Sequence, residues 1–251
     1  MSDNFGIIIL AAGQGKRLGC VDLPKVLLPI GGRPILSYIL ETLEVGGIPK
    51  ENICIVVGFK ADKVEEAAGN GYVYARQAEQ LGTAHAAHTG EQALPAEIDN
   101  FLVLNGDDSV FYHWKSLADF MEGHIKKGNN LTLLTCEADD PALLGRVIRD
   151  KEGKMKAIKE KENVTEEMKN IREVSTGTYA FKRQWFKENF FKIKIIPKLN
   201  EYGLPAFIDL ADKNGDKYDA IKLENSAEWF GINTPEQLRE ANKRKLITHN
   251  S

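Results

Sequence analysis

The sequence from residue 5 to residue 19 is FGIIILAAGQGKRLG, an apolar run that gives way to a glycine-rich, basic segment. The four consecutive apolar residues Ile7–Leu10 do not alternate with polar ones, which is typical of a parallel strand covered on both faces. We therefore predict a buried strand over residues 5–12 and a loop that begins at Gly13. Open α/β folds bind their ligands where such a strand ends.

Short apolar runs alternate with amphipathic stretches through the rest of the first half. We predict strands over 53–57, 101–104 and 131–136, and helices over 34–45, 61–68, 83–94 and 114–127. Thr83 is the predicted N-cap of the third helix. This order of elements predicts a Rossmann-like α/β fold, with a mostly parallel sheet and helices on both faces.

The second half has shorter apolar runs separated by turns. They predict strands over 146–149, 155–159 and 174–181, and helices over 205–211 and 235–243. We expect a mixed sheet or a small β-rich subdomain that covers the first half. Because no linker or internal repeat separates the halves, we expect a single domain over 1–251, with its halves at about 1–135 and 136–251.

Composition excludes several classes of protein. The chain of 251 residues is 43% hydrophobic with a formal net charge of −3, which argues against disorder and against nucleic-acid binding through a basic field. Its three cysteines lie far apart, which excludes a disulfide scaffold and a cysteine-based zinc site. With no signal peptide and no apolar run of about 20 residues, we expect a soluble cytoplasmic protein without a membrane partner.

The loop after the first strand suits an anionic ligand. Gly13 and Gly15 allow backbone N–H groups to approach an anion closely, and Arg17 adds a charge that matches phosphate oxygens. The dinucleotide fingerprint would need glycine at Leu18, and the NTPase loop would need Ser or Thr after Lys16. The alternative is an ordinary glycine-rich turn with solvated cations.

Lys25 is the next candidate along the chain. It follows Pro24, which restrains the backbone, and it precedes an apolar run. A lysine fixed near a glycine loop suits electrostatic clamping of a triphosphate. The alternative is a surface lysine beside a strand.

The pattern LAAGxGxR at 10–17, followed by LPK at 23–25, resembles the sugar-1-phosphate nucleotidylyltransferases. The segment QAEQLGTAHA at 77–86 is similar to the uridine-recognition segment of the N-acetylglucosamine-1-phosphate uridylyltransferases. Five further similar segments follow in the family's order, at 104–107, 145–149, 158–161, 175–179 and 228–233. The resemblance covers residues 6 to about 240, and implies that UTP and a hexose 1-phosphate, first of all N-acetylglucosamine 1-phosphate, form a UDP-sugar and pyrophosphate.

The resemblance also implies site residues. Catalysis would rest on Arg17, Lys25 and Asp107, and Mg²⁺ would be held by Asp107 and Asn233. The nucleotide would contact Leu10, Ala11, Ala12, Gly13, Gly15, Gln77, Gly82 and Thr83. The sugar would contact Gly145, Glu160, Ser175 and Thr176. The first half would thus bind the nucleotide, and the second half would bind the sugar and close over it.

The sequence departs from the family pattern at two positions that bear on the sugar. Ser175 stands where the N-acetylglucosamine enzymes have Asn, so one donor is lost, and Asn105 replaces an aromatic residue beside Asp107. These departures leave open another hexose phosphate or another nucleotide, and the further alternatives are a cytidylyltransferase acting on a polyol phosphate and a non-catalytic nucleotide-sugar-binding regulator. No six-residue repeat follows residue 230, so we expect neither the acetyltransferase domain of the bifunctional enzymes nor its trimer, but a monomer or small homo-oligomer.

Two predictions concern residues outside the proposed chemistry. Asp108, next to Asp107, is predicted to be a turn or surface residue. The aromatic residues Phe186, Phe190 and Phe191 are predicted to be core residues, and not a partner site.

Overall fold

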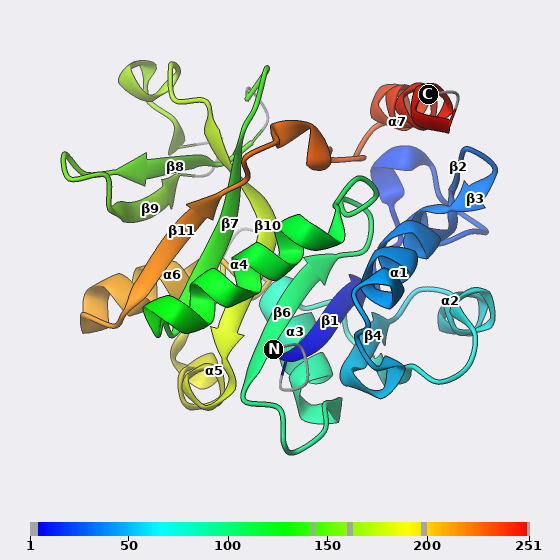
Figure 1. Ribbon diagram of the computed structural model, residues 1–251, viewed down its shortest axis with the longest axis horizontal. Coiled ribbons are helices and arrows are strands. Elements are labelled where there is room, and N and C mark those ends of the chain that lie inside the picture. The colour runs from blue at the N-terminus through cyan, green and yellow to red at the C-terminus, as the bar shows by residue number, and fades with distance from the viewer. Residues whose placement is uncertain (1–4, 142–143, 160–162, 197–199, 250–251) are drawn as a thin grey trace.

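A nine-stranded mixed sheet crosses the molecule in the computed structural model, which describes residues 5–141, 144–159, 163–196 and 200–249 (Figure 1). Its strands are β1 (Phe5–Ala11), β4 (Ile53–Val57), β5 (Val73–Arg76), β6 (Asn100–Asn105), β7 (Leu131–Glu137), β8 (Arg146–Arg149), β9 (Met155–Lys159), β10 (Glu173–Lys182) and β11 (Tyr218–Lys222). A separate small hairpin joins β2 (Pro29–Ile30) to β3 (Arg33–Pro34). The helices are α1 (Ile35–Val45), α2 (Ala61–Ala68), α3 (Thr83–Ala93), α4 (Trp114–Lys127), α5 (Arg183–Asn189), α6 (Ala206–Asn214) and α7 (Pro235–His249).

The main order of strands is β11-β7-β10-β6-β1-β4-β5. Strand β1 lies parallel between β4 and β6, β5 is parallel to β4, and β11 is parallel to β7. Strand β10 enters between β6 and β7 and is antiparallel to both. The α/β sheet is therefore confirmed as mostly parallel but mixed, and the second half extends the same sheet. Only the β8–β9 hairpin lies off the main path, where β8 pairs with β10.

Two apolar clusters cover the two faces of this sheet, which explains why β1 is apolar throughout. Ile8 faces a cluster with residues from α3, α5 and α6. Ile7 and Ile9 face the other cluster, with residues from α1, α2 and α4. Because successive side chains of a strand point to opposite faces, a strand covered on both faces needs an apolar residue at every position.

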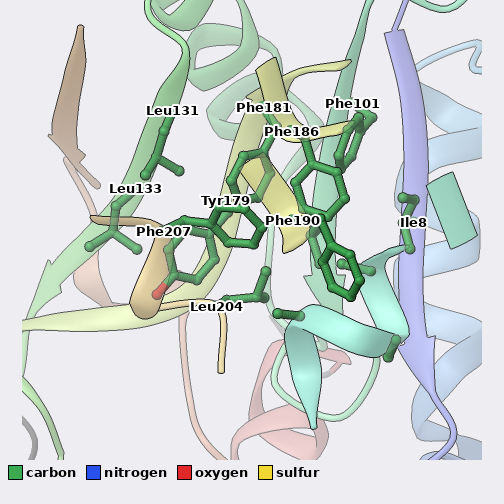
Figure 2. Close-up of a cluster of buried hydrophobic side chains, with 14 of the residues drawn as sticks. Ile8, Phe101, Leu131, Leu133, Tyr179, Phe181, Phe186, Phe190, Leu204 and Phe207 are labelled. Carbon is green, nitrogen blue, oxygen red and sulfur yellow. The ribbon is translucent and has the colours of Figure 1, made fainter. Parts of the chain in front are cut away.

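The first cluster is rich in aromatic side chains, which Figure 2 shows packed against β10. Tyr179 and Phe181 project from β10, and Phe181 contacts Phe186 of α5 and Phe207 of α6 at ring-centroid distances of 5.0 and 5.3 Å. Each fully buried ring of this kind contributes about 1.5–3 kcal/mol. This cluster fixes the position of β10, which carries one wall of the site described below.

Several local predictions were wrong. Strands β5 and β11 and helix α5 were not predicted, and α7 continues beyond residue 243. Thr83 is the first helical residue and not the N-cap, because Gly82 stands at the cap position and the Thr83 hydroxyl instead accepts a bond from the Leu204 N–H at 3.1 Å. Phe186 and Phe190 are buried as predicted, but Phe191 is 82% exposed because it follows the end of α5 on the outer side.

In the described ranges, none of the helices combines the length and the apolar character that crossing a bilayer requires.

Candidate active site

Three adjoining cavities lie beyond the carboxyl ends of β1 and β6. The central cavity, of about 330 Å³, is lined by nine of the residues singled out from the sequence: Leu10, Ala12, Gly13, Lys25, Gln77, Gly82, Thr83, Asp107 and Asn233. The loop cavity, of about 450 Å³, shares four of these and adds Gly15 and Arg17. The hairpin cavity, of about 250 Å³, is lined by Gly145, Ser175 and Thr176, and it shares Thr83 and Asn233 with the central cavity.

Two of the singled-out residues are not brought to these cavities by any described contact. Ala11 is 1% exposed and packs in the apolar cluster below the sheet, because it lies on the face of β1 opposite Leu10. Glu160 lies outside the described residues. The remaining residues gather from seven separate segments of the chain to one edge of the sheet.

Lys25, Asp107 and Asn233 meet where the central and loop cavities join. The Lys25 ammonium forms an ion pair with Asp107 and donates to Asn233 Oδ1 at 3.0 Å. Asp107 comes from the turn after β6 and Asn233 from the segment before α7, so two oxygens from distant elements face one cationic centre. Both side chains of the ion pair are mostly buried, which limits screening by water.

The backbone around Lys25 explains how its side chain is aimed. Lys25 opens a single 3-10 turn after Pro24, and the two following residues, Val26 and Leu27, are buried. Gly15 packs directly against this lysine: a Cβ on Gly15 would lie 2.8 Å from the Lys25 Cβ, and Gly15 has a φ of +78°. Only glycine fits there, so the loop and the lysine are held together.

Gly13, unlike Gly15, is not required by the packing or by the backbone conformation of the protein. A Cβ on Gly13 would meet no protein atom within 4 Å, and its φ is not positive. Gly13 lines both the central and the loop cavity. Its missing side chain therefore leaves open space for a ligand, since the protein's own packing does not require glycine there.

Gln77 and Gly82 form the far side of the central cavity. The buried Gln77 side chain donates from Nε2 to the Gly82 carbonyl at 3.2 Å and contacts His85 Nδ1 at 2.9 Å. Gly82 has a φ of +98°, and a Cβ there would lie 2.6 Å from the Tyr202 carbonyl oxygen. These contacts fix the amide of Gln77 and the turn that begins α3.

Asp108 was predicted to be a turn or surface residue: it does lie in the turn after β6, but it is not a plain surface residue. Asp108 lines both the central and the hairpin cavity, and its Oδ1 accepts a hydrogen bond from the Ile232 N–H at 3.3 Å. Burial, together with the nearby charge of Asp107, raises the pKa of Asp108 to about 7. The direction of the Asp108 side chain is set by the turn after β6. The alternation of side chains along a strand could therefore not predict it.

The hairpin cavity has a wall made by a β-bulge in β10. The pairing register of β10 with β7 shifts between Ser175 and Tyr179, and Ser175 Oγ accepts from the Gly177 N–H at 3.2 Å. The Thr176 hydroxyl donates to the Leu134 carbonyl at 2.8 Å, while the Thr176 carbonyl accepts from the Trp229 indole at 3.0 Å. Thr176 thus shapes the wall, and Ser175 offers the more available hydroxyl.

Sequence reasoning also missed the polar lining residues Gln80 and Glu201. Gln80 lines the central and loop cavities and donates to the Ala12 carbonyl at 2.7 Å, and it lies inside the 77–86 segment that could have indicated it. Glu201 lines the same two cavities. Its segment reaches the site because the Tyr202 N–H donates to the Leu81 carbonyl at 2.7 Å, a contact across 120 residues for which the sequence carries no signal.

The side-chain oxygen atoms of Asp107 and Asn233 also suit a hard divalent cation. Within the ranges that the structure covers, no three His, Cys, Asp or Glu side chains lie close enough to hold a metal. Two converging hard oxygens, beside cavities open to water and phosphate, suit a cation such as Mg²⁺ that keeps several non-protein ligands.

Comparison with known proteins shows the family of the chain. A family profile described as "Nucleotidyl transferase" matches residues 7–247. The chain belongs to the nucleotidyl transferase family.

Curated relatives in this family include two proteins named bifunctional protein GlmU. The one from Pelotomaculum thermopropionicum is 39% identical over 96% of this chain, and the one from Exiguobacterium sibiricum is 33% identical over 95%. In both cases the match covers 52% of the relative, so the chain spans about half the length of these curated relatives.

Solved structures show the same fold as this member of the family. A proposed glucose-1-phosphate thymidylyltransferase from Bacillus anthracis superposes with a TM-score of 0.77 at 22% identity, over 96% of this chain and 94% of that one. HddC from Yersinia pseudotuberculosis gives 0.72 at 24% identity, over 96% and 99%. The α/β architecture with its mixed sheet is therefore common to these proteins.

Proposed function

We propose that this nucleotidyl transferase joins UTP to a hexose 1-phosphate, first of all N-acetylglucosamine 1-phosphate, and releases pyrophosphate. The observation that carries the proposal is the meeting of Lys25, Asp107 and Asn233 between the loop cavity and the central cavity. Sugar-1-phosphate nucleotidyl transfer is the chemistry that the family and its GlmU relatives support, and the choice of UTP and sugar is our proposal.

In the proposed reaction, a phosphate oxygen of the sugar phosphate attacks the α-phosphorus of UTP in line. The bond from that phosphorus to the departing pyrophosphate oxygen breaks as the new phosphoanhydride bond forms. The nucleophile is already an anion, so the protein needs no general base. Its contribution is positioning and neutralisation of charge.

Lys25 and Arg17 are the proposed cations for this charge. Lys25 is mostly buried at the junction of the cavities, whereas Arg17 is exposed at the rim of the loop cavity. The Lys25 charge is therefore less screened and should contribute more. Asp107 and Asn233 would hold Mg²⁺, which supplies further neutralisation of the triphosphate when bound.

We propose that the uridine lies in the central cavity. Gln77, Gly82 and Thr83 would contact the uracil edge from one side, and Leu10, Ala12 and Gly13 the base and ribose from the other. Gly15 would face the phosphates from the loop cavity. Ala11 packs on the other face of the sheet, in the cluster with α1, α2 and α4. Its proposed role is therefore to position the backbone of Leu10 and Ala12.

The sugar would occupy the hairpin cavity, against Gly145, Ser175 and Thr176, with Glu160 as a further candidate. Residues up to about 135 would thus serve the nucleotide and the later ones the sugar. A specific observation favours an alternative sugar such as glucose 1-phosphate: the Ser175 hydroxyl already accepts from the Gly177 N–H and offers a single donor, where an amide would offer two. A different nucleotide or a non-catalytic nucleotide-sugar-binding regulator are the remaining alternatives.

A panel of pyrophosphate release tests the proposal. UTP, dTTP, CTP and ATP would each be combined with Mg²⁺ and with N-acetylglucosamine, glucose or galactose 1-phosphate. We expect release with UTP and N-acetylglucosamine 1-phosphate. Release with another pair would reassign the substrate, and no release from protein that binds UTP would favour the regulator. We also propose that the protein is a cytoplasmic monomer or small homo-oligomer. It would act on small molecules and not on nucleic acid.

A further inference from the structure

The segment that presents Asn233 is held by a reciprocal pair of hydrogen bonds at the start of α7. Gln237 Oε1 accepts from the N–H groups of Asn233 at 2.7 Å and of Thr234 at 3.1 Å. In return, the Thr234 hydroxyl accepts from the Gln237 N–H at 3.3 Å. This is a capping box in which the glutamine reaches one residue further back than the cap itself. Asn233 is thereby fixed relative to the axis of α7.

The same segment is tied to the turn that carries Asp107. Asp108 accepts from the Ile232 N–H at 3.3 Å, and the Ile232 side chain is fully buried in a small apolar cluster with Ile30 and Ala241. The backbone on either side of the Asn233 side chain is therefore anchored, once by Asp108 and once by Gln237. The two oxygens that face Lys25 come from turns that are bonded to each other.

Helix α7 is itself fixed to the first half of the chain. It returns from the region of β11 to lie beside the β2–β3 hairpin, as Figure 1 shows at the red end of the chain. There the Gly31 N–H donates to Asn242 Oδ1 at 2.9 Å. A capping side chain on a helix that is docked in this way can set the position of a ligand atom, since neither end of the connection is free to move.

We propose that Gln237 is a positioning residue for a cation site: by binding the Asn233 and Thr234 N–H groups, it holds Asn233 Oδ1 opposite Asp107. This inference rests on the proposed function, in which Asp107 and Asn233 hold a divalent cation. Without the glutamine oxygen, both N–H groups bind water and the peptide of Asn233 can rotate. Loss of a contact that orients a metal ligand typically lowers metal affinity about 10–100-fold.

The experiment compares three variants of the full chain by their affinity for Mn²⁺. Gln237→Ala removes the acceptor, and Gln237→Glu keeps an acceptor of the same length. Glu240→Ala is the matched control, because this residue of α7 pairs with Arg244 further along the helix and takes no part in the bonds at Asn233 and Thr234. Free Mn²⁺ is measured by electron paramagnetic resonance with UTP present, against a blank of UTP alone, and UTP binding is measured separately in EDTA.

We expect Gln237→Ala to weaken Mn²⁺ binding about tenfold or more, with UTP affinity in EDTA unchanged. Gln237→Glu and Glu240→Ala should stay within about threefold of the parent protein, even where Glu240→Ala lowers the melting temperature as much as Gln237→Ala does. Unchanged Mn²⁺ binding in Gln237→Ala, or an equal loss in Glu240→Ala, would overturn the inference. A parent protein that binds no Mn²⁺ beyond the UTP blank would instead overturn the proposed function, and the inference with it.

Discussion

The contrast between Gly13 and Gly15 leads to a test that separates ligand approach from folding. Gly13→Ala adds a methyl group that no protein atom lies near, whereas Gly15→Ala adds one that lies 2.8 Å from the Lys25 Cβ and 3.0 Å from the Cys20 sulfur. The two substitutions are chemically identical and only two residues apart. Their effects should nevertheless be opposite in kind.

The structure gives the size of each effect. For Gly13→Ala, stability should be unchanged or raised by up to about 1 kcal/mol, because alanine restricts the unfolded chain. If a nucleotide approaches the Gly13 backbone, a displacement of about 1 Å lowers kcat/KM about 100-fold, which corresponds to about 2.7 kcal/mol. For Gly15→Ala, a left-handed alanine costs about 1–2 kcal/mol and the overlap about 1–3 kcal/mol more.

Thermal unfolding and pyrophosphate release together form the assay. We expect Gly13→Ala to melt within about 3 °C of the parent protein and to lose most of its activity. Gly15→Ala should melt clearly lower. Full activity in Gly13→Ala would refute the idea that a ligand lies against this backbone, and a large loss of stability would refute the open space described at Gly13.

Three further predictions concern single side chains. Lys25→Met should lower kcat about 10²–10³-fold, whereas Arg17→Ala should lower it only about tenfold because solvent screens the exposed guanidinium. Both variants should keep the melting temperature of the parent protein. Equal losses of kcat in the two variants would contradict the argument from their difference in burial. Ser175→Asn should raise kcat/KM for N-acetylglucosamine 1-phosphate relative to glucose 1-phosphate about 3–10-fold, the value of one added hydrogen bond, and an unchanged ratio would remove Ser175 from sugar recognition. Burial lowers the pKa of His124 from 6.5 to about 4, so unfolding takes up a proton below pH 6.5 and stability is lost as the pH falls from about 6.5 to 4. This loss amounts to at most about 3 kcal/mol, and the fall in melting temperature over that range should be smaller in His124→Leu; identical slopes would refute it.

The local elements of the first half could be predicted because their signals are local. Helices α2 and α4 and strand β4 have the predicted bounds. Each helix is followed directly by a glycine, and β4 is a continuous apolar run, so the signals are local to each segment. Strand β5 was missed because it lies at the edge of the sheet, where only Ala75 of its four residues is buried. The apolar residue Phe191 was misplaced because a short helix ends beside it, and composition alone does not show where a helix ends.

The candidate site could be predicted where glycine turns follow strands, and not where distant segments meet. Residues 10–17 and 104–107 lie at the ends of β1 and β6, which pair side by side, so their convergence follows from the parallel sheet. Asp108 and Glu201 could not be found in this way. The first depends on the direction of one turn, and the second on backbone contacts between residues 81–84 and 202–204.

The insertion of β10 between β6 and β7 has a consequence for the order in which the chain acquires its structure during synthesis. Strand β6 has β1 on one side, but its other side is covered by residues 179–182, which leave the ribosome about 75 residues later. Until then, the apolar segment Phe101–Leu104 has an open edge of the kind that templates aggregation. A fragment that ends near residue 135 should therefore precipitate when expressed alone, so the first half of the chain depends on the second half to become a stable protein.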